Sequence, residues 1–154
     1  MIPSTGSRVP RHTASRVNEH IRQQMEERVE QYAVADREAI TERLAELDRE
    51  WDIERALEAN AATAVLMGVA LGATVDRRLF YLPAVVGGFL LQHAVQGWCP
   101  PVPLMRRLGF RTADEIAEER FALKTLRGDF LDVPKQREWP SASDTHEVLE
   151  AVRR

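Results

Sequence analysis

Cysteine is almost absent from this 154-residue sequence, in which Cys99 is the single thiol. One cysteine excludes both an intrachain disulfide framework and a zinc site built from several thiolates of one chain. An excess of positive charge is also lacking, because 21 basic residues stand against 24 acidic ones and the formal net charge is −3. This balance gives no electrostatic reason to expect a nucleic-acid partner.

The start of the chain lacks the apolar segment of a secretory signal. Arg8, Arg11 and Arg16 precede the first acidic residue, but no hydrophobic stretch follows them, so we do not expect a cleaved leader. Residues 1–13 are rich in turn formers and show no apolar periodicity. We therefore expect a disordered lead over 1–13.

Charge is nearly missing from the middle of a chain that is 29% charged overall. Only three charged side chains occur between residues 61 and 105: Asp76, Arg77 and Arg78. The stretches on either side, 57–75 and 79–98, are each long enough as helices to cross a hydrocarbon core of about 30 Å. The pattern predicts an all-α fold with an integral-membrane hairpin of two transmembrane helices over 57–105. The alternative is two buried helices of a water-soluble bundle.

Aromatic residues stand at the ends of these two stretches. Phe80 and Tyr81 follow the charged turn, and Trp98 ends the second stretch. Aromatic rings are enriched at both surfaces of a bilayer, so these positions favour the transmembrane interpretation.

Glycine and proline are both absent from residues 15–55. Apolar side chains recur there at steps of three and four, from Val17 to Trp51, as on one face of an amphipathic helix. We expect one long charged helix over 14–56 that packs against another helix, as in a coiled coil. A row of glutamates at every fourth position runs from Glu38 to Glu58. It either forms a surface for a cation or a basic partner, or faces water and is partly neutralised by the neighbouring arginines.

The segment after the apolar block begins with mixed apolar and basic residues. Thr112 and Glu115 have the spacing of a capping box, and Gly128 is suited to close the helix that this box opens. We therefore expect an interfacial segment and a short capped C-terminal helix over 106–129, followed by a flexible tail over 130–154.

Basic residues are distributed unequally about the predicted spans. Two of them, Arg77 and Arg78, occupy the turn. Ten flank the outer ends: Arg37, Arg43, Arg49, Arg55, Arg106, Arg107, Arg111, Arg120, Lys124 and Arg127. The positive-inside rule therefore predicts that both termini lie in the cytoplasm, as in a bacterial inner-membrane protein.

Small residues recur at helical spacing in both spans, at Ala64, Gly68 and Gly72 in the first and at Ala84, Gly87 and Gly88 in the second. Small faces let helices approach closely in lipid, where packing drives association. These faces serve either the hairpin itself or contact with another copy. We expect a homo-oligomer, with a dimer favoured.

Five polar side chains fall near the predicted cytoplasmic end of the spans: Asn60, Thr63, Gln92, His93 and Gln96. Unpaired polar groups are costly in lipid, so we expect a cluster. Its members either form hydrogen bonds between the helices or line a polar vestibule. A third interpretation, His93 as a ligand of haem or a metal, has no accompanying partner motif. We expect no cofactor and no metal.

Cys99 is a candidate reactive thiol at the predicted cytoplasmic boundary. The nearby Arg106 and Arg107 would lower the pKa of this thiol and favour the thiolate. The alternative is a small apolar residue at a helix end.

Several short motifs together resemble a known family. They are Trp51-Asp52-Ile53-Glu54-Arg55, Gly97-Trp98-Cys99-Pro100-Pro101 and Arg106-Arg107-Leu108-Gly109. Over about residues 50–110 the chain is similar to the YgaP-like inner-membrane hairpin domain of bacteria, a family of largely unknown function. The resemblance implies an inner-membrane location and a homodimer. Some members carry a rhodanese sulfurtransferase module, which this sequence lacks, so no sulfurtransferase activity is implied.

The function that we expect is that of a non-enzymatic, membrane-anchored scaffold or partner-binding subunit. Its partners would be the lipid bilayer, a second copy of the chain and a cytoplasmic protein bound through residues 15–55. The alternative hypothesis is a membrane component that handles thiols or sulfur through Cys99. A transport role is a third hypothesis, disfavoured by the few charges that could line a pore.

Overall fold

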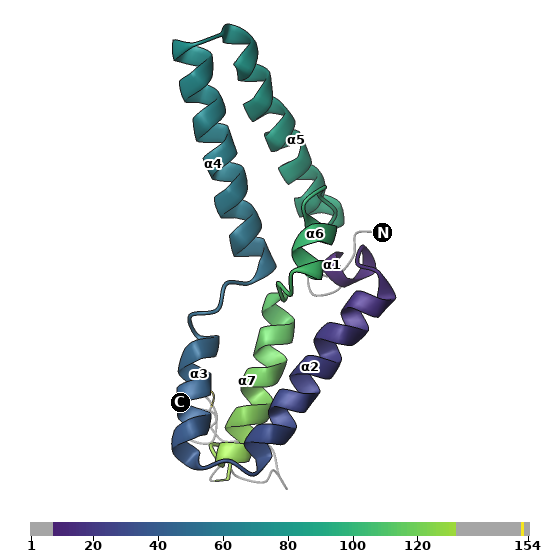
Figure 1. Cartoon of the computed structure of the whole chain (residues 1–154), viewed down its shortest axis with the longest axis vertical. Helices are drawn as coiled ribbons and strands as arrows, with labels where there is room; N and C mark the ends of the chain where they lie inside the picture. Colours follow the sequence, from purple (N-terminus) through teal and green to yellow (C-terminus); the bar gives the residue numbers. More distant parts are fainter. Residues whose placement is uncertain (1–7, 132–151, 153–154) are drawn as a thin grey trace, which may run out of the picture. The chain divides into compact units, whose positions relative to one another are not determined.

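A computed structural model describes residues 8–131 and residue 152 of the chain, and every regular element among them is helical. The all-α class is therefore confirmed. The elements are α1 (Arg8–Arg11), α2 (Ser15–Ala33), α3 (Arg37–Leu47), α4 (Ile53–Thr74), the 3-10 helix η2 (Arg77–Phe80), α5 (Tyr81–Gln96), α6 (Val102–Arg107) and α7 (Ala113–Arg127) (Figure 1).

Contacts divide the chain into two compact units. Unit 1 comprises Met1–Gln24 and Glu50–Ile116, and unit 2 comprises Met25–Arg49 and Ala117–Arg154. Of the expected disordered ends, residues 1–7, 132–151 and 153–154 lie outside the described residues.

The last part of the predicted disordered lead is ordered. Residues Arg8–Arg11 form α1, and the side chain of Val9 is buried in the apolar cluster of unit 1. The amide of His12 donates to the carbonyl of Val9 at 3.1 Å. The expectation of disorder through residue 13 was wrong because one apolar side chain anchors this otherwise polar segment.

The predicted single helix over 14–56 is also corrected, because two breaks divide it. Asp36 caps α3, with its Oδ1 accepting from the Ala39 amide at 2.8 Å. Asp52 caps α4 in the same way, accepting from the Arg55 amide at 2.8 Å. A short side chain that accepts a hydrogen bond from the backbone amide three residues later starts a new helix. Such a cap can therefore separate two helices without a glycine or a proline between them.

The capping box at the start of α7 is confirmed. The Thr112 amide donates to Glu115 Oε2 at 2.8 Å, and the Glu115 amide donates to Thr112 Oγ1 at 3.3 Å. At the other end Gly128 adopts a φ of 87°, and its amide donates to the carbonyl of Lys124. This left-handed conformation costs glycine little.

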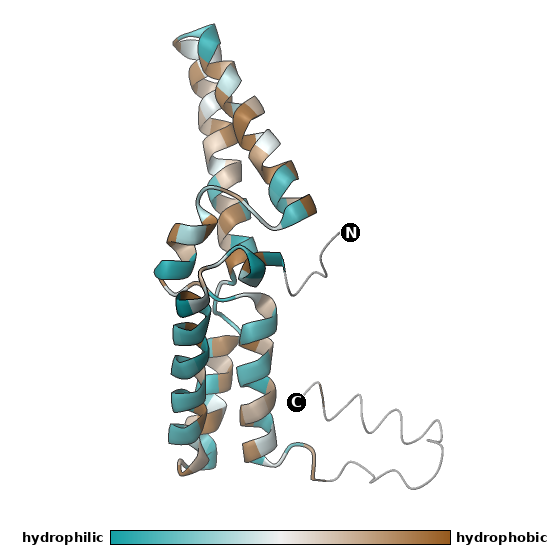
Figure 2. Cartoon of the chain, turned by 90° about the vertical axis from the view of Figure 1, so that its right-hand side faces the viewer, coloured by the Kyte–Doolittle hydropathy of each residue, from teal (hydrophilic) through white to brown (hydrophobic). Residues whose placement is uncertain are grey.

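Helices α4 and α5 lie side by side and antiparallel near the turn that joins them, and they diverge away from it (Figures 1 and 2). Asp76 starts η2 by accepting from the Arg78 amide at 2.8 Å. A Cβ atom at Gly68 would lie 2.6 Å from Cδ of Pro83, and one at Gly72 would lie 3.0 Å from the Phe80 ring. The two glycines therefore permit the close approach of the helices at this end.

Two segments, Ile53–Thr74 and Arg77–Gln96, are long and apolar enough to cross a membrane. In the most apolar 18-residue stretch of each segment, only 28% of the first and 6% of the second is buried within the chain. Figure 2 shows that hydrophobic residues occur along the length of both helices. Core helices of a water-soluble bundle would be mostly buried, so this exposure counts against the soluble alternative.

In unit 2, one buried carboxylate joins three helices. Glu119 on α7 has a side chain with 0% exposure. It accepts from Arg43 of α3 at 2.8 Å and from Arg28 of α2 at 3.2 Å. Apolar side chains are buried in the same unit: Met25, Ile40, Leu44, Leu47 and Leu123.

We predict that Glu119→Ala lowers the free energy of unfolding by about 3 kcal/mol, because it leaves two partly buried guanidinium groups without their shared carboxylate. The measurement is urea unfolding of the full chain in detergent, followed by circular dichroism.

The matched control is Glu118→Ala, which removes an exposed carboxylate from the preceding position of the same helix. We expect it to change stability by less than about 0.5 kcal/mol. Equal losses for the two variants would contradict the role given to Glu119.

Candidate functional site

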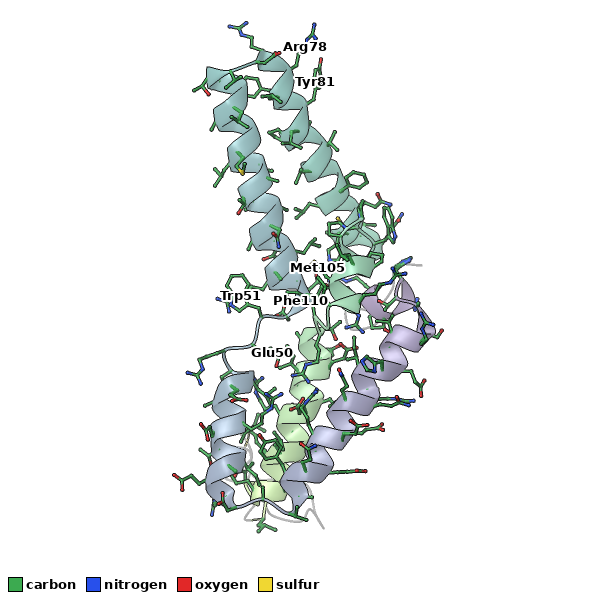
Figure 3. All side chains as sticks on the ribbon, viewed as in Figure 1. Glu50, Trp51, Arg78, Tyr81, Met105 and Phe110 are labelled. Atoms are coloured by element: carbon green, nitrogen blue, oxygen red, sulfur yellow. The ribbon has the colours of Figure 1, made fainter. Side chains whose placement is uncertain are left out.

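The end of the α4–α5 pair that lies away from the turn, called the base below, holds the apolar core of unit 1. Its buried members are Val9, Ile53, Ala56, Leu57, Cys99, Val102 and Met105, with Phe110 packed against them. They come from α1, α4, α6 and the connecting segments. Figure 3 shows Met105 and Phe110 at the base, and Arg78 and Tyr81 at the turn.

A carboxylate and an imidazole join α4 to α5 at the base. His93 is 5% exposed, and its Nε2 lies 2.5 Å from Oε2 of Glu54. Glu54 stands in the first turn of α4 and His93 in the last turn of α5. The contact therefore ties the beginning of α4 to the end of α5.

Arg8 adds a third member to this contact. Its Nη2 lies 3.3 Å from Oε1 of Glu54, and its Nη1 donates to the carbonyl of Ala94 at 2.8 Å. Gly97 ends α5 at a φ of 79°, and a Cβ atom there would lie 2.3 Å from the Cβ of Arg8. A glycine is therefore required at position 97 both for the left-handed backbone conformation and for the close contact with α1. We call Arg8, Glu54 and His93 the basal triad.

A second charged contact at the base centres on Arg106, whose side chain is fully buried. It donates to both carboxylate oxygens of Glu115, at 2.6 and 2.7 Å, and to Oδ1 of Asn18 at 2.9 Å. Burial by itself would raise the pKa of Glu115. The hydrogen bonds that Glu115 accepts from Arg106 and from the Thr112 amide outweigh this effect of burial, so the pKa of Glu115 lies below its ordinary value.

A third contact fixes the chain where it enters α4. Arg111 donates from Nε and Nη2 to the two carboxylate oxygens of Glu50, at 2.8 and 2.6 Å. The carbonyl of Arg111 also accepts from the Ile53 amide at 2.8 Å. Glu50 and Glu54 both belong to the row of glutamates from Glu38 to Glu58, for which the sequence pattern allows two alternative roles. In the structure, both form ion pairs within the chain.

The five predicted polar residues do not form one cluster. Asn60 donates to the carbonyl of Ala56 at 2.7 Å, and Thr63 donates to that of Ala59 at 2.8 Å, both within α4. Gln92 is half-buried and Gln96 is exposed, and neither side chain forms a hydrogen bond to a described residue. His93 alone reaches across to the other helix, where it meets Glu54 instead.

The small residues have separate roles in the two spans. Gly68 is buried against the start of α5, Gly72 is buried against Phe80 of η2, and Ala64 is half-buried. By contrast, a Cβ atom at Gly87 or Gly88 would meet nothing within 4 Å, and Ala84 is exposed. The small face of α4 thus serves packing within the chain, and the small face of α5 stays open.

Cys99 is 5% exposed, and burial raises the pKa of its thiol. This direction is opposite to the one expected from the nearby arginines. Arg106 is committed to Glu115, and the immediate neighbours of the sulfur in the core are apolar. No local pattern in the sequence indicates this enclosure, because Val9, which belongs to the same core, is distant along the chain.

We predict that Cys99 in the folded chain reacts with maleimides at least about tenfold more slowly than a free thiol at pH 8. The raised pKa lowers the thiolate fraction there, and burial blocks access. The rate should continue to rise with pH beyond the range in which the rate of a free cysteine levels off. The measurement is the labelling rate as a function of pH, by mass spectrometry.

A control cysteine at the exposed position 15, made as Ser15→Cys with Cys99→Ser, should react at the rate of a free thiol. Rapid labelling of native Cys99, equal to that of the control, would restore the reactive-thiol interpretation.

Among the described residues no group of three or more histidine, cysteine, aspartate or glutamate side chains is placed to hold a metal ion. Comparison with family models, with curated proteins and with solved structures gives no match to this chain. The chain's own geometry is therefore the ground on which its function is inferred.

Proposed function

We propose that this chain is a small bacterial inner-membrane protein, anchored by α4 and α5 as a transmembrane hairpin, that acts as a non-enzymatic homo-oligomeric scaffold or partner-binding subunit. The observation that carries the proposal is the exposure of apolar side chains along both helices. Leu66, Val75 and Leu91 are each 68 to 73% exposed, and Met67 is 57% exposed. Such a surface is unfavourable in water and favourable in hydrocarbon.

The dimensions and polar ends of the pair support the same proposal. The 22 residues of α4 make a helix about 33 Å long, which matches the hydrocarbon core of a bilayer. Arg77 and Arg78 stand at the turn, with Tyr81 75% exposed beside them. The ion pairs of unit 1 gather at the base, which would lie at the opposite surface of the membrane.

The placement of both termini in the cytoplasm follows from the excess of basic residues beyond the base. The resemblance to YgaP-like hairpin domains supports the same location, and membership of that family is part of the proposal. The alternative, a thiol chemistry at Cys99, is not favoured by any contact of that residue.

We predict that cysteine labelling reports this topology. In a Cys99→Ser background expressed in bacterial cells, Asp76→Cys at the turn should react with a membrane-impermeant maleimide from outside. Ser15→Cys should react only after the membrane is opened. Labelling of Ser15→Cys from outside would reverse the orientation, and recovery of the chain in the soluble fraction would overturn the membrane proposal itself.

The open small face of α5 is where a second copy would pack. Ala84 and Gly88 are four residues apart, the spacing at which small residues let two helices approach in lipid. The space beside Gly87 and Gly88 holds no atom within 4 Å of where a Cβ would stand, so the face is not used within the described chain.

We predict that Gly88→Leu weakens self-association in detergent by about tenfold or more in dissociation constant, because a large side chain separates the two helix backbones. The measurement is native mass as a function of protein concentration.

The matched control is Ala70→Leu, an exposed small position on α4. It should leave the association unchanged. If wild type is monomeric at all concentrations, or if both variants associate as wild type does, this face is not the oligomer interface.

A further inference from the structure

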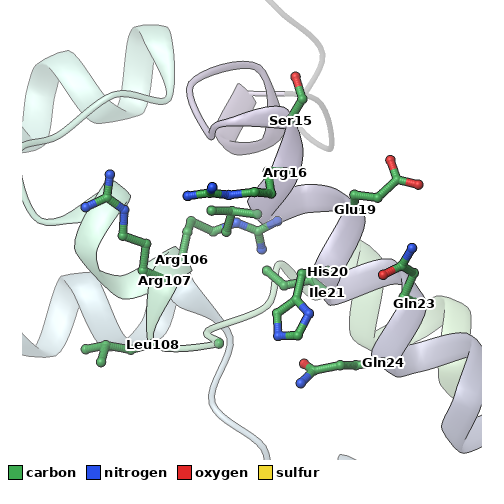
Figure 4. Close-up of a pocket in the computed structure, with 12 residues that line it drawn as sticks. Ser15, Arg16, Glu19, His20, Ile21, Gln23, Gln24, Arg106, Arg107 and Leu108 are labelled. Atoms are coloured by element: carbon green, nitrogen blue, oxygen red, sulfur yellow. The ribbon is translucent and has the colours of Figure 1, made fainter.

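A groove of about 770 Å³ lies in unit 1 between the first turns of α2 and the end of α6. The side chains that matter for its chemistry are Arg16 and Glu19 of α2, and Arg106, Arg107 and Leu108 at the end of α6. Figure 4 shows Arg16 extending from α2 toward the side on which α6 carries Arg107. Neither the basal triad nor Cys99 belongs to the lining of this groove.

The groove has a fixed wall. Arg106 is 1% exposed and joins α6 to α2 through Oδ1 of Asn18, while Glu115 holds the same guanidinium from the other side. Asn18 in turn donates to the carbonyl of Pro10 at 2.9 Å. The two helices therefore do not depend on a ligand to stay in place.

The charge that faces the groove is positive and unneutralised. Arg16 and Arg107 are exposed, and neither forms an ion pair with any described residue. The acid in the lining, Glu19, lies 2.7 Å from Arg22. No acidic residue stands in the first turn of α2, so the positive end of that helix dipole is also left without a local counter-charge.

Apolar side chains border this positive charge. Leu104 in α6 and Leu108 just after it are 61 and 69% exposed. Helix α6 follows the base after only a short connection from α5, so under the proposed function it lies at the cytoplasmic surface of the membrane. Exposed leucines beside unpaired arginines match the boundary between acyl chains and phosphates.

We propose that this groove binds the phosphate of an anionic phospholipid headgroup, with Arg16 and Arg107 as the phosphate-binding side chains and Leu108 in contact with the glycerol and acyl region. Guanidinium groups bind phosphate oxygens through paired charge-assisted hydrogen bonds. A phosphate free in solution would share that chemistry but has no use for the exposed leucines. The inference rests on the proposed membrane location.

The test measures lipid binding to the purified full chain in a neutral detergent by native mass spectrometry, with phosphatidylglycerol and phosphatidylcholine as probes. Wild type should bind phosphatidylglycerol at least about tenfold more tightly than phosphatidylcholine. Arg16→Gln with Arg107→Gln should lose that preference, since each removes one of the two phosphate ligands.

The matched control is Arg49→Gln, which removes an exposed arginine outside the groove. It should bind phosphatidylglycerol as wild type does. Circular dichroism melting of all variants establishes that they are folded, which is expected because Arg16 and Arg107 are exposed and form no ion pair with a described residue.

Three outcomes would overturn the inference: no preference of wild type for the anionic lipid, an unchanged preference in the double variant, or an equal loss in Arg49→Gln. Competition by millimolar inorganic phosphate would assign the groove to a soluble phosphate instead.

Membrane fractionation of the same proteins separates the groove proposal from the proposed function. A chain that stays in the membrane without lipid preference contradicts only the groove proposal, whereas a soluble chain contradicts the proposed function.

Discussion

A carboxylate in the first turn of α4 meets an imidazole from the last turn of α5 and a guanidinium from α1. Glu54 is thus bound on both oxygens, by His93 on one side and by Arg8 on the other. The two helices diverge toward this end, so their separation at the base is set by these long polar side chains and by the apolar cluster beside them. Removing Glu54 would leave the buried His93 and the guanidinium of Arg8 without their common partner, and buried polar groups that lose a hydrogen-bond partner are costly.

The chain separates two kinds of packing along its length. Near the turn, glycines bring α4 against Pro83 and Phe80, and the outer surfaces of both helices stay apolar and exposed. In unit 2, the helices carry many charges, and Glu119 holds two arginines from different helices. Near the turn, the apolar side chains of α4 and α5 are thus exposed. In unit 2, ion pairs between side chains of different helices hold the helices together.

The sequence predicted those features that depend on neighbouring residues. The absence of charge located α4, η2 and α5, and the Thr112 and Glu115 spacing located the start of α7, because both are local patterns. The breaks at Asp36 and Asp52 also depend on neighbouring residues, because each aspartate caps the helix that follows it. The apolar periodicity running across them favoured one helix, and the breaks were missed. A periodic pattern does not report whether the helix that carries it is continuous.

The candidate site was much harder to predict, because its contacts join residues far apart in the chain. Glu54 and His93 are 39 positions apart, and Asn18 and Arg106 are 88 apart. The sequence pattern predicted a cluster of five polar residues that included Asn60 and His93, whereas His93 meets Glu54 instead. A similarly long stretch of sequence separates Cys99 from Val9, so nothing near the cysteine indicated an apolar enclosure that raises its pKa.

The divergence of α4 and α5 has a consequence for the lipid around them. A pair that touches through glycine at one end and through long side chains at the other has a tapered cross-section. Inserted in a bilayer, it displaces more lipid from one leaflet than from the opposite one. Under the proposed membrane location, such a taper would affect lipid packing differently in the two leaflets without any contact to an individual lipid.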